Sequence, residues 1–142
     1  MAIRRGDIFH IEAFPPLDGD AEKGRYVIVM ADHEEGDDGV EVVGITKNPR
    51  YNPDREALPL PNRRTHRPCT TNLWEDSWAI PSWYVLVAVE RFGVRRHGYV
   101  EKQTMAPLLR ALNRARSGGL NALELGRRVT GQEEIEPPET GG

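Results

Sequence analysis

One short run, Arg25 to Ala31, limits what this chain can fold into more than any other feature. It reads Arg-Tyr-Val-Ile-Val-Met-Ala, so it is almost wholly apolar after its arginine and is rich in β-branched side chains. A run of this length and composition is typical of a strand buried on both faces near the centre of a sheet. A second run, Trp83 to Val89, has the same character. The chain therefore needs a sheet with central, well-covered strands.

The rest of the sequence is divided into short segments by turn-forming residues. With 11 prolines and 14 glycines in 142 residues, short strands joined by turns are favoured over a helical bundle. Further strands are predicted at Asp7–Glu12, Val40–Thr46, Ser77–Ile80 and His97–Val100, with a weak edge strand at Glu56–Leu60. The acidic turn before Val40 predicts that the strand there forms a hairpin with the Arg25 run.

One helix is predicted near the C-terminal end. Thr104 can cap it, Pro107 is expected in its first turn, and Gly118 with Gly119 can end it. Its apolar stripe is made by Met105, Leu108, Leu109 and Leu112. A short second helix is predicted at 120–128, and the acidic segment 129–142 is expected to be a disordered tail. The fold class is thus mainly β with a C-terminal helix (α+β), in one barrel domain over 1–128.

Composition excludes several classes of protein. Cys69 is the lone cysteine, so no internal disulfide can form and a reducing compartment suits the chain. No apolar run approaches the roughly 18 residues that a membrane span needs. The charged start has no apolar segment behind it, so we do not expect it to be a signal peptide. We therefore expect a cytoplasmic protein that does not bind a membrane.

Charge is distributed unevenly, although the net charge is only −3. Between Glu12 and Glu41, ten acidic residues face two basic ones. The segment 47–67 reverses the balance with the basic residues Lys47, Arg50, Arg55, Arg63, Arg64 and Arg67. This asymmetry is compatible with a polyanion-binding face beside an acidic rim, and equally with an ordinary solvated surface.

Several segments, taken in order, resemble the MazF/PemK family of toxins from bacterial toxin–antitoxin pairs. They are Arg4-Arg-Gly-Asp-Ile-Phe-His10, Gly24-Arg25 before an apolar strand, Val42-Val-Gly-Ile-Thr46, Asp76-Ser77-Trp-Ala79, and the closing stretch from Gly98 to Leu112. The resemblance covers residues 4–112. It implies an SH3-like small β-barrel, usually a homodimer, that cleaves single-stranded RNA without a metal or other cofactor and binds a cognate antitoxin protein.

By position, the resemblance implies that Arg25 and Thr46 form the catalytic pair. An arginine suits the phosphate because its planar fork donates two hydrogen bonds and stays charged. The predicted RNA-binding residues are Lys47, Arg50, Arg55, Arg63, Arg64, His66, Arg67 and Trp74. Trp74 stands beside a turn and is the best candidate for base stacking, whereas Trp78 and Trp83 are expected in the core or an interface.

The chain also departs from the family pattern. Tyr26 replaces the proline that usually follows the loop arginine, and Tyr84–Val89 lacks the arginine and aspartate of the late strand. No acid or base is thereby assigned: His66 is a candidate, His10 is expected to be structural, and His97 is expected in solvent at a turn. The alternative is a non-catalytic module on the same fold, either a CcdB-like gyrase inhibitor or a relative that only binds an antitoxin. No histidine or cysteine pair has metal-ligand spacing.

Overall fold

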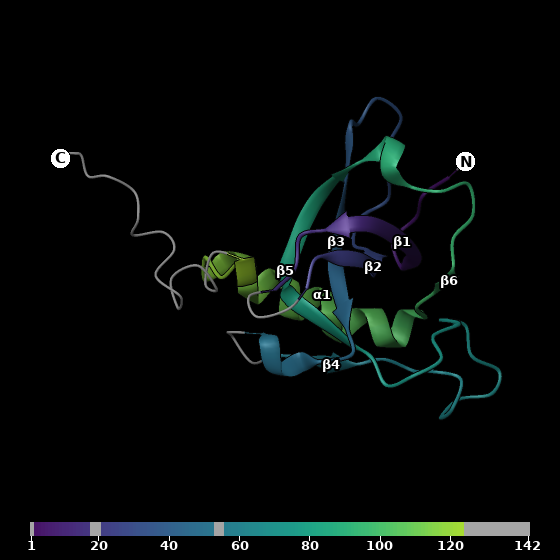
Figure 1. Cartoon of the computed structure of the whole chain (residues 1–142). Helices are drawn as coiled ribbons and strands as arrows, with labels where there is room; N and C mark the ends of the chain where they lie inside the picture. Colours follow the sequence, from purple (N-terminus) through teal and green to yellow (C-terminus); the bar gives the residue numbers. More distant parts are fainter. Residues whose placement is uncertain (1, 18–20, 53–55, 124–142) are drawn as a thin grey trace.

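The structure is a computed structural model, and it describes residues 2–17, 21–52 and 56–123. Its elements in chain order are β1 (Asp7–Phe14), β2 (Lys23–Val29), β3 (Gly39–Thr46), η1 (Pro49–Tyr51), β4 (Leu58–Pro59), β5 (Trp78–Ala88), η2 (Val89–Arg91), β6 (Gly98–Tyr99) and α1 (Lys102–Ser117). The strands form one antiparallel sheet in the order β4-β5-β3-β2-β1-β6, which curves around a core (Figure 1). This confirms the predicted mainly β fold with a C-terminal helix.

The predicted central strands lie where their composition placed them. In β2, Val27, Ile28 and Val29 are fully buried, and β3 pairs with β2 as the expected hairpin. The weak edge strand is confirmed as β4 at the sheet margin, although it is only two residues long. β2 begins at Lys23, so Arg25 lies inside the strand and its backbone conformation is set by pairing with Ile11 of β1.

The two strands predicted at 77–80 and 83–89 are wrong as separate elements, because β5 runs unbroken through both. Pro81 lies between the two predicted strands, and a proline cannot donate to a ladder. The structure places it in a wide register shift, where Ile45 pairs with Ala79 but Val43 already pairs with Tyr84. The extra residues of β5 therefore need no partner there. The Trp83 ring lies against Gly44, where an added Cβ would be 2.3 Å from a ring carbon.

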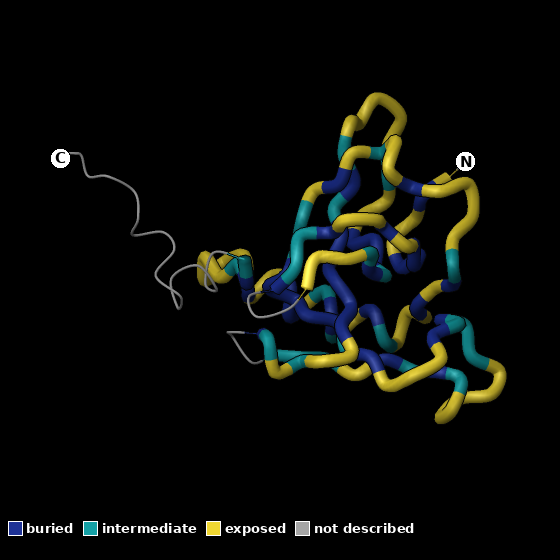
Figure 2. Tube along the Cα trace, in the orientation of Figure 1, coloured by how far each residue is buried: buried dark blue, intermediate teal, exposed yellow. Residues whose placement is uncertain are grey.

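Apolar clusters pack on both faces of the sheet, which is why β2 is apolar from Val27 to Val29 (Figure 2). The cover ends toward the C-terminal end of β5, where Leu86 is 73% exposed. One face packs around Phe9, Phe14 and Trp83. The other packs against α1 through Met105, Leu108 and Leu112, with Leu109 at the margin. The predicted helical stripe is thus confirmed.

The start of the helix differs from the prediction. The N-cap residue is Glu101, whose carbonyl accepts hydrogen bonds from the backbone N–H groups of Thr104 and Met105. Thr104 is therefore inside α1, and Pro107 is in the helix interior rather than its first turn. The end is confirmed, with Gly118 as C-cap. Most of the predicted second helix and all of the predicted tail lie outside the described residues.

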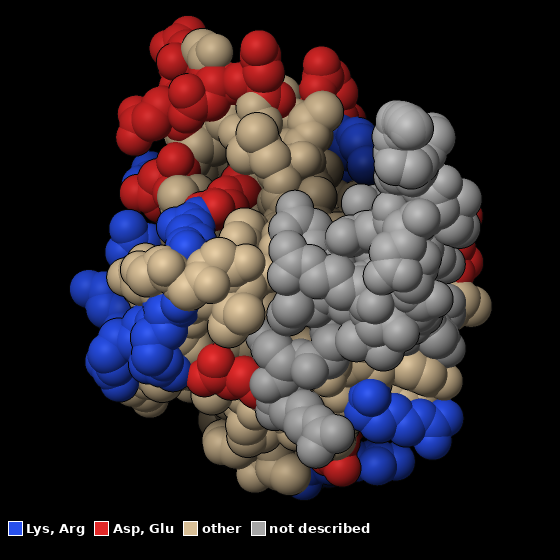
Figure 3. Space-filling view, turned by 90° about the vertical axis from the view of Figure 1, so that its left-hand side faces the viewer, with Lys and Arg blue, Asp and Glu red and all other residues tan. Residues whose placement is uncertain are grey.

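Charge separates in space as it does along the chain. Acidic side chains gather at one end of the molecule, at the height of the β2–β3 hairpin, while basic side chains lie lower (Figure 3). The exposed acids of this hairpin are Asp32, Glu34, Glu35, Asp37 and Asp38. The hairpin is thus a strongly negative end that would repel a polyanion.

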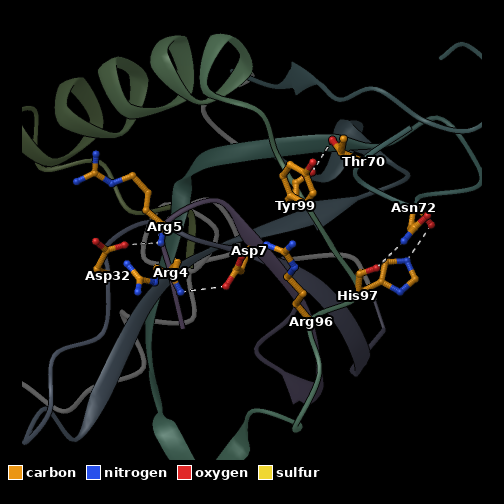
Figure 4. A network of polar contacts seen from close by, with 9 residues as sticks. All are labelled: Arg4, Arg5, Asp7, Asp32, Thr70, Asn72, Arg96, His97 and Tyr99. Carbon is orange, nitrogen blue, oxygen red and sulfur yellow. Dashed lines mark hydrogen bonds and ion pairs between the residues drawn. The ribbon is translucent and has the colours of Figure 1, made fainter. Parts of the chain in front are cut away.

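A buried carboxylate fastens the first strand to the segment before β6 (Figure 4). Asp7 is only 4% exposed. Its Oδ2 accepts a hydrogen bond from the backbone N–H of Arg4 at 3.0 Å, and its Oδ1 accepts one from Nη1 of Arg96 at 2.8 Å.

Asp7→Ala should lower the free energy of unfolding by about 2 kcal/mol, because it removes two hydrogen bonds, one of them charge-assisted. Denaturant unfolding would measure this. The matched control is Asp32→Ala, which removes an exposed carboxylate bonded to the Arg5 N–H and should cost about 0.5 kcal/mol or less; equal losses would contradict the prediction.

Candidate active site

The pairing between β2 and β3 ends at Val27 and Gly44, and a cavity of about 590 Å³ opens beyond that pair. It is lined by residues 23–26 from β2, by residues 45–48 from the end of β3, and by residues 72–75 from the loop after β4. His10, Ser77 and His97 complete the wall. We call it the strand-end cavity. It brings together segments that are far apart in the sequence.

Arg25 and Thr46 both line the strand-end cavity. The β2–β3 register, continued two residues past Val27 and Gly44, sets these two positions opposite each other. The hairpin therefore brings the sequence-predicted pair to one place.

The Arg25 side chain is held in a largely buried position. The residue is 7% exposed, its Nη2 donates to the Ala21 carbonyl at 3.4 Å, and its guanidinium lies 5.7 Å from the centre of the Trp83 ring. A phosphate that reached this guanidinium would meet a charge already largely removed from water, where charge-assisted hydrogen bonds are stronger.

Thr46 has a local role in addition to its place in the cavity. Its Oγ1 accepts the backbone N–H of Asn48 at 2.9 Å, which closes the turn after β3, and the residue is 1% exposed. Hydroxyl side chains commonly stabilise turns in this way. Because the hydroxyl accepts in that contact, its proton is available to be donated elsewhere.

A second cavity of about 860 Å³ adjoins the first and shares Asn72, Trp74 and Glu75 with it. Its other lining residues are Arg63, Arg64, His66, Arg67, Pro68 and Cys69. We call it the arginine pocket. Four of the predicted RNA-binding residues thus line it together with Trp74, and Lys47 lines the strand-end cavity.

The two cavities are joined by contacts among Arg63, Asn72 and Trp74. The Arg63 guanidinium lies 4.3 Å from the centre of the Trp74 ring, and its Nη2 donates to Asn72 Oδ1 at 2.8 Å. Asn72 in turn donates through Nδ2 to the His97 carbonyl at 2.9 Å (Figure 4). Trp74 is 65% exposed, as the sequence predicted, whereas Trp83 is fully buried. An exposed indole backed by a guanidinium is suited to stacking against a flat ring.

One predicted RNA-binding residue among the described ones, Arg50, lines neither cavity. Arg50 is exposed on η1, where its Nη2 donates to the Tyr51 hydroxyl at 3.3 Å. That hydrogen bond raises the pKa of Arg50. Arg55 lies outside the described residues.

The structure adds residues that sequence reasoning missed. His97 is partly buried rather than solvated, because its Nε2 lies 2.8 Å from the Asn72 carbonyl and its ring lies 4.4 Å from that of Tyr26. His10 lies on the other side of Tyr26, 5.0 Å between ring centres. The alternation of β1 predicted His10 only as a half-buried structural residue. The groups that contact His10 belong to β2 and to the distant segment before β6, and no local pattern specifies them.

Two further findings concern the part of the chain that the structure describes. No group of three or more His, Cys, Asp or Glu residues there could hold a metal ion. None of its helices is both long and apolar enough to cross a bilayer.

Comparison with known proteins shows the fold. No protein-family model matches the sequence, and no curated protein matches it. Among solved structures, the chain is similar to an endoribonuclease in complex with its cognate antitoxin from Mycobacterial species, with 14% sequence identity and a TM-score of 0.56. The likeness covers 84% of this chain and 95% of that one. The chain therefore has the small β-barrel fold of that endoribonuclease, as the resemblance to the MazF/PemK toxins predicted.

Proposed function

We propose that this protein is the toxin of a toxin–antitoxin pair and that it cleaves single-stranded RNA without a metal ion. The observation that carries the proposal is that Arg25 and Thr46, from two different strands, line one cavity that adjoins an arginine-rich pocket. The shared fold with an endoribonuclease supports it.

In the proposed reaction the 2′-hydroxyl of the RNA attacks the adjacent phosphorus. The 5′-oxygen leaves, so the products are a 2′,3′-cyclic phosphate and a 5′-hydroxyl. Negative charge on the non-bridging oxygens grows toward the transition state, and preformed donors aimed at that charge accelerate the step. Arg25 would supply a bidentate cation, and Thr46 would donate its hydroxyl to the same phosphate.

The nucleotides that flank the cleaved bond would bind in the arginine pocket. Arg63, Arg64 and Arg67 would contact phosphates, and Trp74 would stack against a base, which suits single-stranded RNA because unpaired bases can be splayed out. The acidic β2–β3 hairpin would keep the RNA off that end of the molecule.

Trp74→Ala is expected to weaken RNA binding by about 1–3 kcal/mol, the usual contribution of one aromatic–base stack. Stability should be unchanged within about 0.5 kcal/mol, because the indole is 65% exposed. Fluorescence anisotropy with a short labelled oligoribonucleotide would measure the affinity. The matched control is Val94→Ala, which truncates an 87% exposed side chain outside both cavities. Equal affinities for wild type and Trp74→Ala would exclude the stacking role.

The proposed partners are a cognate antitoxin and a second copy of the chain. An antitoxin with an acidic segment would suit the arginine pocket, because an acidic peptide and RNA compete for the same positive field. Inhibition of RNA cleavage by a purified antitoxin, relieved by excess RNA, is the expected result, and light scattering would report the homodimer.

The direct test is incubation of the purified protein with an RNA pool in the presence of a chelator. Cleavage to products with cyclic phosphate ends is expected, and intact RNA at high protein concentration would exclude the proposed ribonuclease activity.

The uncharged stretch Tyr84–Val89 favours one alternative, a non-catalytic toxin on the same barrel. Growth arrest with intact RNA and inhibited DNA supercoiling would identify a gyrase inhibitor, whereas absence of any toxicity would indicate a module that only binds an antitoxin.

A further inference from the structure

The strand-end cavity and the arginine pocket are lined almost wholly by neutral and basic side chains. Among the described residues that line either of them, Glu75 is the only one with a carboxylate. A carboxylate repels phosphates, so it lowers the affinity of this surface for any polyanion. A contact with phosphate therefore does not account for Glu75.

Glu75 directly follows Trp74 in the loop between β4 and β5, and both residues line both cavities. The Arg63 guanidinium lies over one face of the exposed Trp74 ring, 4.3 Å from its centre. An unpaired base that stacks on Trp74 therefore uses the opposite face. Because consecutive Cα atoms are about 3.8 Å apart, the edge of that base comes within reach of the Glu75 carboxylate.

The segment that carries Trp74 and Glu75 is held at both of its ends. Leu73 is buried, and its carbonyl accepts a hydrogen bond from the backbone N–H of Arg63 at 2.8 Å. The Ser77 hydroxyl donates to the Glu75 carbonyl at 2.9 Å, and the Ser77 carbonyl accepts the backbone N–H of Leu60 at 2.9 Å. The backbone of this segment is thus ordered before any ligand binds, which reduces the entropy that binding costs.

The other two residues shared by the cavities are poorly suited to distinguish one base from another. Asn72 already uses both ends of its amide, since its Oδ1 accepts from Arg63 at 2.8 Å and its Nδ2 donates to the His97 carbonyl at 2.9 Å. Trp74 offers a ring face, on which every base can stack. Glu75 is the charged group of the three, and its carboxylate can select by hydrogen bonding.

Glu75 has a single ion-pair partner among the described residues. Its Oε2 lies 3.5 Å from Lys47 Nζ, and both side chains are more than half exposed. An exposed pair of this kind contributes little to stability and is easily exchanged for other contacts. A carboxylate accepts about four hydrogen bonds through its two oxygens, so Glu75 can bind a donor while it stays beside Lys47.

One base matches a carboxylate with two hydrogen bonds. Guanine presents two donors side by side on its Watson–Crick edge, N1–H and N2–H, which suit the two oxygens of a carboxylate. Adenine and cytosine present one amino group beside a ring nitrogen that only accepts, and uracil presents one N–H between two carbonyl oxygens. Acceptors that face a carboxylate are repelled and lose their hydrogen bonds to water.

We propose that Glu75 makes this protein selective for guanine. A guanine base stacks on Trp74, on the face opposite Arg63, and donates from N1 and N2 to the Glu75 carboxylate. This rests on the RNA binding of the proposed function, and it specifies the substrate as single-stranded RNA with a guanosine at this position. Glu75 determines specificity and takes no part in the chemical step.

Binding of short labelled oligouridylates that carry one variable nucleotide tests this assignment. The variable base is guanine, hypoxanthine, adenine, cytosine or uracil, and 2′-O-methylation prevents the proposed reaction. The wild type should bind the guanine oligonucleotide about 10- to 100-fold more tightly than the uracil one, the usual discrimination of a bidentate base contact. Hypoxanthine is guanine without its 2-amino group, and its oligonucleotide should bind with intermediate affinity. Fluorescence anisotropy would measure all five.

Glu75→Gln keeps the shape of the side chain but removes its charge and one acceptor. The variant should lose most of the guanine preference and bind the all-uridine oligonucleotide at least as tightly as the wild type, because a repulsive charge is gone. A merely structural role would weaken binding of every oligonucleotide alike. The matched control is Glu90→Gln, which changes an exposed carboxylate on η2 outside both cavities and should keep the wild-type affinities.

The outcomes separate guanine recognition from the proposed function. If the wild type cleaves RNA but binds all five oligonucleotides equally, or favours adenine or cytosine, or keeps its guanine preference in Glu75→Gln, the assignment is wrong and the proposed function stands. If guanine is preferred through Glu75 and unmodified RNA stays intact, guanine recognition stands and the ribonuclease does not. If the folded wild type binds none of the oligonucleotides and cleaves no RNA, both are overturned.

Discussion

Replacing Arg25 with alanine should reduce RNA cleavage by about 10²- to 10³-fold, the usual cost of removing one preformed donor from a developing oxyanion. The effect should be large because Arg25 is only 7% exposed and its guanidinium lies beside Trp83, where charge-assisted hydrogen bonds are stronger than in water. Arg25→Lys should lose less than Arg25→Ala, since the ammonium keeps the charge but not the planar fork. Single-turnover cleavage of a labelled oligoribonucleotide, with chelator present, would measure all three proteins.

The control for Arg25 is Arg110→Ala, which removes an exposed arginine from α1 and should cleave RNA like the wild type. Circular dichroism of each variant would establish that the fold is retained. A folded Arg25→Ala that cuts RNA as fast as the wild type would exclude Arg25 from the reaction.

Trp83→Ala should lower the free energy of unfolding by about 3–5 kcal/mol, the usual cost of truncating a buried tryptophan. The ring is fully buried, packs on Phe14 at 5.3 Å between ring centres, and fills the space over Gly44. Its Nε1 donates to the Pro15 carbonyl at 3.0 Å, so truncation also leaves that carbonyl without its indole partner. Urea unfolding followed by circular dichroism would measure the change.

Trp74→Ala is the matched comparison for Trp83, because the same side chain is 65% exposed at position 74 and should contribute about 0.5 kcal/mol or less to stability. If Trp83→Ala does not fold, Trp83→Phe keeps an aromatic ring and loses the Nε1 donor, and its unfolding should still be measurably easier. A loss below about 1 kcal/mol in Trp83→Ala would contradict the burial of this ring at the centre of the core.

Local patterns in the sequence were enough to predict most elements of the fold. The run around Val27 is apolar because the sheet is covered on both faces there, and this requirement acts on consecutive residues. The glycines after Ser117 end α1 for an equally local reason. Other bounds were wrong: β5 runs unbroken through Pro81 at a register shift, and α1 holds Pro107 in its interior and not in its first turn.

The residues of the candidate site could likewise be predicted only in part from the sequence. Arg25 and Thr46 were predicted from the resemblance to the MazF/PemK family, and the short hairpin that joins their strands brings both residues to one cavity. Their companions His10 and Asn72 could not be picked, because they reach the cavity from the first strand and from the loop after β4. The residues next to His10 do not indicate that Gly24 leaves space for the His10 ring.

By itself, therefore, the sequence determined most of the strands and the helix, because hydrophobic burial and turn chemistry act over a few consecutive residues. Only the tertiary structure decided that Arg25 would be buried beside Trp83, that Trp74 would border two cavities, and that His10 would lie over Gly24. Those contacts depend on the strand register and on where distant loops fold back. These are set by the packing of the whole chain, and no short segment encodes them.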